Sequence, residues 1–415
     1  MYISLPQRGD RSKTGAPAAR VSSVVITLGV VSMLTDVSSE SVASILPLYI
    51  TGAMGLSMIA YGFIDGIYQG VSAIVRIGGG WASDRTDNPK WVAFFGYAVS
   101  AVTKVGLLFV SGFAGIASVI ALDRLGKGVR TAPRDALITA SSEPSNLGKS
   151  FGVHRMLDTI GAAGGPLLAF LILFFVPTGY HLVFIVSLGF AVVGVVILGL
   201  VVPARRPRRE SVAAGEARQP FRWGSLAEPR LRRLILTAGI LAVLTVGDGF
   251  IYLVLQDRSP FAAQWFPLLY VGTNVAFFIF AVPLGRFADR FGRARVFVLG
   301  HVALLAAYAC AALPVGGAAV TIVCLVLLGA FYAATDGVLA ALAGEVCPPE
   351  SRATGIAAAQ TVVAIGRLIG STAFGILWFA AGRELAVVIV AAALAAAIPA
   401  LLVLIRPLTR VAVNE

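Results

Sequence analysis

The sequence predicts an all-α membrane protein with about twelve transmembrane helices in two related halves. Of its 415 residues, 58% are hydrophobic and only 13% are charged, and the mean hydropathy is +0.87. A soluble domain carries about 25% charged residues, so this chain must fold with lipid as its solvent. Lipid cannot satisfy exposed backbone groups, which makes helices the expected form of the apolar segments. These segments lie near 24–50, 58–82, 91–112, 115–142, 151–175, 182–202, 234–256, 264–285, 296–314, 318–343, 355–380 and 385–405.

The distribution of Lys and Arg predicts the orientation of the chain. The loops opposite to the basic side hold only Arg258 and Arg383. Short basic loops stay in the cytoplasm, so we expect both termini there. The net charge of +12 then reflects topology and anionic lipid, and we expect no nucleic-acid partner. Most of the 33 basic residues lie in the segments that would share the cytoplasmic side, 1–22, 83–90, 143–149, 203–233, 286–295, 344–354 and 406–415.

The sequence lacks the motifs of the common enzyme and pump chemistries. Its three cysteines, Cys310, Cys324 and Cys347, do not have metal-ligand spacing. No G-x-x-x-x-G-K-[ST] run is present for binding a nucleotide. We therefore expect no catalytic residue, no metal and no cofactor.

A polar segment, 203–233, separates an expected six-helix bundle in 1–202 from a second one in 234–415. Several features recur at matching places in the two halves. Parallel repeats of this kind, with a site at their interface, are typical of transporters. The matching features are Asp36 and Asp248 in the middle of the first and seventh segments, Gly80-x-x-x-Asp84-Arg85 and Gly285-x-x-x-Asp289-Arg290, and Asp135 and Asp336.

The run from Gly285 to Arg295, GRFADRFGRAR, resembles the cytoplasmic loop signature of the major facilitator superfamily, G-x-x-x-D-R-x-G-R-[RK]. The first-half copy keeps its Gly, Asp and Arg, but it lacks the later Gly and has Asn88 in place of an Arg. The resemblance implies two pseudo-symmetric six-helix bundles that alternate in access. It also implies latches in the two cytoplasmic loops, formed by Gly80, Asp84, Arg85, Gly285, Asp289, Arg290 and Arg293.

The fourth segment carries six charged residues that cannot face lipid. Its Arg124-x-x-x-Gly128 is similar to the superfamily motif R-x-x-x-G, whose Arg is associated with proton coupling. At 100° per residue, one column of the helix holds Asp123, Lys127, Arg130 and Arg134, and the next holds Arg124 and Asp135. Two interpretations stay open, a gate or binding site and a structural network of ion pairs.

In the first segment, Asp36 and Glu40 share a helix face. Neighbouring carboxylates in a low dielectric can hold a proton near neutral pH, which predicts a proton-coupling site. We expect Arg124 and Arg134 to hold these acids when they are deprotonated. Together with GKGVRTAPRD in the fourth segment, TDVSSE resembles one bacterial branch of the superfamily, which implies the bacterial inner membrane.

The fifth segment contains Gly152, Gly161, Gly165 and Pro166, in a pattern that resembles the antiporter signature of exporters. Simple helix packing is the alternative interpretation. Arg155 and Asp158 lie in the same segment and extend the charged cluster of the fourth. Because membrane cations concentrate in the first half, a negatively charged or zwitterionic substrate group is expected to dock there. Further cavity candidates are Asp65, Gln69, Arg76, Tyr252 and Arg367.

The predicted function is secondary active transport of a small solute by alternating access. Protons would couple through Asp36, Glu40, Asp248 or Asp336, with Arg124 as a partner, and the fifth segment favours export by antiport. An uptake symporter or a facilitator on the same scaffold is the first alternative, and a membrane-embedded enzyme or sensor is the second. The expected partners are the solute, protons and the bilayer, and the expected state is a monomer.

Overall fold

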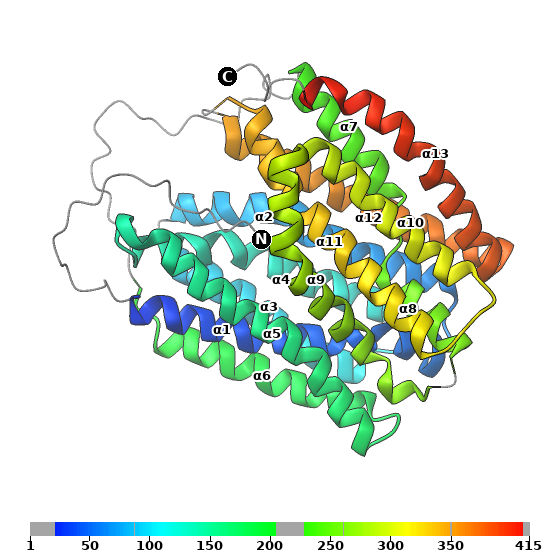
Figure 1. Ribbon diagram of the computed structural model, residues 1–415. Coiled ribbons are helices and arrows are strands. Elements are labelled where there is room, and N and C mark those ends of the chain that lie inside the picture. Colours follow the sequence, from blue (N-terminus) through cyan, green and yellow to red (C-terminus); the bar gives the residue numbers. More distant parts are fainter. Residues whose placement is uncertain (1–20, 87, 205–227, 260, 349–350, 410–415) are drawn as a thin grey trace.

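A computed structural model of the chain describes residues 21–86, 88–204, 228–259, 261–348 and 351–409 (Figure 1). These residues form helices and no strand. The first half contains α1 (Ser23–Leu48), α2 (Met58–Thr86), α3 (Pro89–Phe109), α4 (Gly112–Ala140), α5 (Leu147–Phe175) and α6 (Tyr180–Leu200). The second half contains α7 (Pro229–Val243), α8 (Asp248–Arg258), α9 (Pro267–Phe291), α10 (Arg293–Ala312), α11 (Ala318–Val346), α12 (Arg352–Ala381) and α13 (Arg383–Thr409).

Among the described residues, 11 helical spans are long and apolar enough to cross a membrane. In that count α7 and α8 form one span, Pro229–Arg258. The helix α4 is 29 residues long but is not among the 11, because its charges interrupt every apolar stretch. The predicted all-α membrane fold is therefore confirmed, with α4 in the place of the expected segment 115–142.

Local sequence explains several helix ends. Ser22 caps α1 by accepting a hydrogen bond from the backbone of Val24 (3.3 Å). Proline occupies the first turn of α3, α7 and α9, where its missing N–H costs nothing. Gly292 is the single residue between α9 and α10, and its φ of 97° suits glycine alone. The tight turn places α9 and α10 antiparallel.

The structure corrects the sequence prediction in two places. The segment 234–256 is not one helix, because the chain leaves helical geometry between Val243 and Asp248. Asp248 therefore begins α8 and does not lie in the middle of a helix. The signature sequences also do not form loops: α2 continues to Thr86 and α9 continues to Phe291. Gly80, Asp84, Arg85, Gly285, Asp289 and Arg290 thus lie in the last turns of helices, and Arg293 begins α10.

The helices of each half pack mainly on one another (Figure 1). In the first half α1 contacts α5 and α6, and α4 lies against α2 and α3. In the second half α11 contacts α9 and α10, α10 contacts α13, and α12 contacts α7. The main contacts between halves join α2 to α12 and α5 to α9. The predicted bundle boundaries at 202 and 234 stay a prediction, since most of the intervening segment lies outside the described residues.

A row of glycines brings α2 against α12. A Cβ atom at Gly62 would lie 2.6 Å from the carbonyl oxygen of Ser371, and one at Gly66 would lie 2.7 Å from that of Leu368. Gly70 continues the row, and Gly375 faces Gly62 from α12. Small residues at every fourth position allow two membrane helices to approach at the level of their backbones. The two halves are therefore in direct backbone contact along this seam.

Aromatic rings also join the two halves, at the end of the molecule where α1 ends and α2 begins. The rings of Tyr61 and Phe250 lie 4.7 Å apart across the two halves. Phe170 of α5 lies 5.2 Å from Trp265, which precedes α9. These contacts close the two halves on each other at this end.

The close contact of α2 with α12 predicts that a methyl group added to a glycine of α2 lowers stability only where that glycine faces α12. Gly66→Ala should lower the free energy of unfolding by about 1–3 kcal/mol, because the methyl group would press on the α12 backbone. Gly78→Ala in the same helix is the matched control, since nothing lies within 4 Å of its added Cβ atom. Thermal unfolding of the purified variants measures the difference. Equal unfolding temperatures for the two variants would contradict the proposed seam.

Candidate functional site

A cavity of about 550 Å³ lies between the two halves. Both halves contribute walls: α1, α2 and α4 from the first, and α8, α9, α11 and α12 from the second. Its volume is in the range of small-molecule sites. The lining residues are Glu40, Ala43, Leu46, Pro47, Tyr61, Asp65, Tyr68, Gln69, Lys127, Asp248, Gly249, Tyr252, Tyr270, Thr273, Asn274, Phe277, Tyr332, Asp336 and Arg367.

The break between α7 and α8 lies directly before Asp248 and Gly249, which line the cavity from the second half. Tyr308 of α10 stabilises it by donating a hydrogen bond to the carbonyl of Leu244 (3.0 Å) and accepting one from the N–H of Val246 (2.7 Å). Irregular backbone at membrane depth is tolerated where protein groups satisfy it and where it borders a cavity. Asp248 follows at the start of α8, where the helix dipole favours a carboxylate. Tyr332 donates a hydrogen bond to this carboxylate (2.8 Å).

Asp65 of α2 lies beside this break from the other half. Its carboxylate accepts a hydrogen bond from the hydroxyl of Ser371 (2.7 Å). It packs directly on Gly247, where a Cβ atom would collide with it. Asp65 is therefore held against the residue that precedes Asp248, at the seam between the halves.

A third acidic group in the cavity has a cationic partner. The guanidinium of Arg367 lies 3.5 Å from the carboxylate of Asp336 and over the ring of Tyr332 at 5.5 Å. These residues come from α11 and α12. The fold thus brings Arg367, a predicted cavity residue, to the acid that pairs with it.

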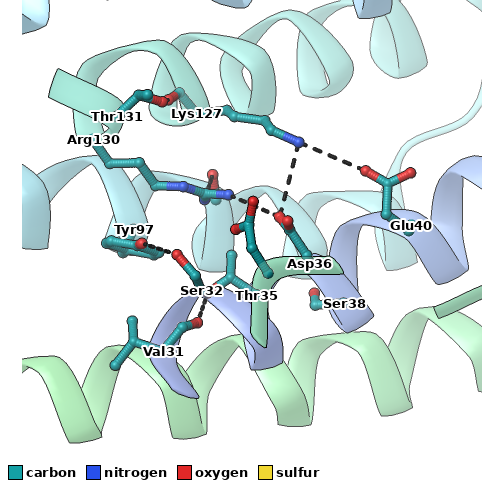
Figure 2. A network of polar contacts seen from close by, with 12 residues as sticks. Val31, Ser32, Thr35, Asp36, Ser38, Glu40, Tyr97, Lys127, Arg130 and Thr131 are labelled. Carbon is teal, nitrogen blue, oxygen red and sulfur yellow. Dashed lines mark hydrogen bonds and ion pairs between the residues drawn. The ribbon is translucent and has the colours of Figure 1, made fainter. Parts of the chain in front are cut away.

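In the first half, Lys127 of α4 reaches two acids of α1 (Figure 2). Its ammonium nitrogen lies 3.8 Å from Asp36 and 3.6 Å from Glu40. Arg130 also approaches Asp36, at 3.8 Å. Tyr68 donates a hydrogen bond of 3.4 Å to Glu40. The predicted pairing of Arg124 and Arg134 with these acids is wrong, since Lys127 and Arg130 hold them.

Arg134 binds other groups than the α1 acids. It donates hydrogen bonds to Ser32 (3.1 Å) and Asp135 (3.0 Å), and it lies 3.7 Å from Asp158. Asp158 also pairs with Arg155 at 3.4 Å. Arg76 lies 3.7 Å from Asp135. The network thus joins α1, α2, α4 and α5.

Arg124 belongs to a separate buried group with Asp123, Lys104 and Tyr68. Asp123 accepts hydrogen bonds from Lys104 (3.0 Å) and from Arg124 (3.0 Å from Nε), and all three side chains are at most 3% exposed. The guanidinium of Arg124 lies 3.9 Å from the ring centre of Tyr68, in a cation–π contact. Neither Asp123 nor Arg124 lines the cavity. The geometry of Asp123, Lys104 and Arg124, called the Asp123 trio below, favours the interpretation of the α4 charges as a structural network of ion pairs.

The α4 cations also do not fill the cavity with positive charge. Of the first-half cations within the described residues, only Lys127 lines it. Arg124, Arg130 and Arg134 are buried among helices of the first half. The structure therefore does not support docking of a negatively charged substrate group on the α4 arginines.

The glycines of α5 set the packing of the acids on α1. Cβ atoms at Gly161 and Gly165 would lie within 3 Å of backbone atoms around Met33 and Glu40. Gly152 has nothing within 4 Å of its added Cβ atom, and Pro166 is buried inside α5. Two glycines of the antiporter-like pattern thus seat α5 against α1, beside Asp36.

The second signature sequence forms contacts within its own half. Arg293 pairs with Asp289 (2.9 Å) and with Glu345 of α11 (3.2 Å). In the first copy, Gly80 of α2 lies near Ala132 of α4, 3.4 Å from an added Cβ atom. The side chain of Asp84 lies outside the described residues. The second signature therefore ties α9, α10 and α11 together in this conformation.

Sequence reasoning missed several residues of the cavity. Tyr61, Tyr270, Thr273 and Asn274 line it, and Ser371 holds Asp65. Two signals were present: the Gly62, Gly66, Gly70 row indicates a close helix contact beside Asp65, and the glycines flanking Asp248 indicate a broken helix.

The family model of the Major Facilitator Superfamily matches residues 28–271 and 249–415. The chain belongs to this superfamily. It is a multi-pass membrane transporter and not an enzyme.

Relatives and solved structures agree with this assignment. An uncharacterised MFS-type transporter of Methanocaldococcus jannaschii is 28% identical over 369 residues, which cover 86% of this chain and 89% of that protein. An uncharacterised protein of Mycobacterium bovis is 28% identical over 309 residues, covering 71% and 73%.

Three solved structures share the fold at low identity. The nucleoside transporter NupG has a TM-score of 0.76 at 16% identity, covering 92% of this chain and 99% of that one. A POT family transporter in complex with 5-aminolevulinic acid has 0.77 at 13%, covering 94% and 97%. A bacterial homologue of the human lysosomal transporter Spinster, inward-facing and unoccupied, has 0.69 at 16%, covering 93% and 95%.

The Asp123 trio predicts a large stability effect. Asp123→Asn should cost about 3–5 kcal/mol, because it leaves Lys104 and Arg124 buried without a carboxylate. Adding Lys104→Met should recover part of this loss, since it removes one of the uncompensated charges. Asp135→Asn is the matched control with a smaller expected loss, as that carboxylate is 31% exposed. Thermal unfolding measures all variants, and a harmless Asp123→Asn would refute the structural role.

Proposed function

We propose that this transporter is a proton-coupled antiporter that exports a small solute by alternating access. The observation that carries the proposal is the position of Lys127. It lines the central cavity and pairs with two acids, Glu40, which also lines the cavity, and Asp36, which does not (Figure 2). A change in the charge of these acids therefore alters a residue that faces the solute.

The α1 acids can carry the coupling proton. Asp36 and Glu40 share a helix face and both lie near Lys127, and neighbouring carboxylates in a low dielectric can hold a proton. When Asp36 and Glu40 are charged, they hold Lys127 and tie α4 to α1. Protonation neutralises these acids and releases Lys127. Proton binding is thereby linked to the packing of α1 on α4 and to the charge presented to the solute.

The contacts between the halves support alternating access. The glycine seam of α2 and α12 and the ring contacts of Tyr61 and Phe170 close the end where α1 finishes. With the basic loops in the cytoplasm, as the sequence predicts, that end would face the outside and this conformation would open to the cytoplasm. Rocking of one half against the other would expose the cavity to the opposite side.

The direction of transport rests on α5. Its glycine and proline pattern resembles the antiporter signature, and Gly161 and Gly165 place the helix beside the α1 acids. We assign the protein to the bacterial inner membrane, as a monomer with both termini in the cytoplasm. An uptake symporter is the alternative, and vesicles of known orientation with the pH gradient reversed separate the two, because only an exporter moves solute against an inward proton flow.

Asp36→Asn should abolish transport driven by a pH gradient while leaving counterflow exchange, because the asparagine cannot release a proton. The solute for this assay comes from a ligand-stabilisation screen of metabolites, siderophores, sugars, amino acids and cationic drugs. Glu143→Gln is the matched control, as it removes an exposed carboxylate of the same half that lies outside the network. Full gradient-driven activity of Asp36→Asn in proteoliposomes would remove Asp36 from the coupling mechanism.

A further inference from the structure

The charge on the cavity wall is negative. Four acids line it, Glu40, Asp65, Asp248 and Asp336, against two cations, Lys127 and Arg367. Lys127 pairs with Glu40 and Arg367 pairs with Asp336. Ion pairing therefore compensates two of the acids and leaves Asp65 and Asp248.

The hydrogen bonds to these two carboxylates come from neutral hydroxyl groups. Asp65 accepts a hydrogen bond from Ser371, and Asp248 accepts one from Tyr332. Among the residues that the structure describes, no Lys or Arg forms an ion pair with either of them. Carboxylates at membrane depth without a cation are costly, so their position favours the arrival of a positive charge.

The two carboxylates belong to different halves but meet at one place. Asp65 projects from α2 and packs on Gly247, while Asp248 begins α8 at the next residue. Any larger side chain at Gly247 would displace Asp65. A cation bound here would touch both halves, as a transported solute must.

Tyrosine rings surround the same space. Five of them line the cavity, Tyr61, Tyr68, Tyr252, Tyr270 and Tyr332. The rings of Tyr252 and Tyr270 lie 4.7 Å apart and nearly perpendicular, and the hydroxyl of Tyr252 is engaged by Thr273 (2.7 Å). Tyrosine faces attract organic cations and pack against apolar groups.

We infer that the transported solute is an organic cation, with an ammonium or related positive group between Asp65 and Asp248 and its apolar part against the tyrosine rings. The inference rests on the proposed transport function and adds the substrate class. A volume of about 550 Å³ accommodates a solute of metabolite or drug size. An anion would meet the two uncompensated carboxylates and is excluded by their charge.

Equilibrium binding to the purified wild-type protein tests the charge of the solute. The probes are tetraphenylphosphonium and tetraphenylborate, which match in shape and differ in sign, and benzyltrimethylammonium as a smaller cation. Binding of a cationic probe without binding of tetraphenylborate is the expected result. Preference for tetraphenylborate, or failure of both cations to bind, would overturn the assignment.

Variants locate the binding group. Asp65→Asn and Asp248→Asn should each weaken binding of the cation about tenfold or more, because each removes one of the two carboxylates that face the ligand charge. Asp257→Asn is the matched control, since this acid pairs with Arg383 outside the central cavity. Wild-type affinity in both cavity variants would reject the site.

Arg367→Gln separates electrostatics from folding. It removes a cation and unmasks Asp336, so binding of the cationic probe should strengthen, whereas a merely structural disturbance would weaken it. These measurements use no pH gradient. Cation binding without gradient-driven transport would reject the proton coupling and keep this inference, and gradient-driven transport of a solute without cation binding would do the reverse.

Discussion

Charges on a helix that crosses a membrane must be shielded from lipid, and the architecture of the first half depends on that constraint. The helix α4 carries Asp123, Arg124, Lys127, Arg130, Arg134 and Asp135 along its length. The neighbouring helices contact these charges with acids from α1 and α5, with hydroxyls from α1 and α3, and with the rings of Tyr68 and Tyr97. The desolvation cost of each cation is offset by at least one of these groups.

The α4 charges fall into two classes by their access to the cavity. Asp123 and Arg124 are buried with Lys104 and have the geometry of a framework that fixes α3 to α4. Lys127 stands at the edge of the cavity, in looser contact with two acids. Tight, buried pairs resist exchange of partners, whereas a longer pair beside a solvated space can exchange them. Lys127 is therefore the α4 charge whose contacts suit the proposed proton coupling.

Asp36 and Asp248 occupy matching places in the sequences of the two halves, but their environments differ. Asp36 is surrounded by cations of α4, whereas Asp248 begins a helix after a break and is held by a tyrosine hydroxyl. The two halves share a fold but have diverged in chemistry. One half provides a network of acids and cations that would respond to protons under the proposed function, and the seam with the other provides carboxylates without an ion-paired cation. This division gives a single cavity two kinds of acid, as exchange of a proton for a cationic solute would require.

The sequence by itself determined the helical membrane fold, the places of the transmembrane segments and the residues that carry charge, because apolar runs and embedded charges are local properties of the chain. Only the tertiary structure decided which charges meet. Lys127 and Arg130 hold Asp36 in place of Arg124 and Arg134, since pairing across helices depends on how α1 and α4 rotate and cross. The break before Asp248 and the contact of Asp65 with Ser371 also emerged only from packing. Helical periodicity identifies a shared face, but the partner of that face is set by the glycine contacts between helices far apart in the chain.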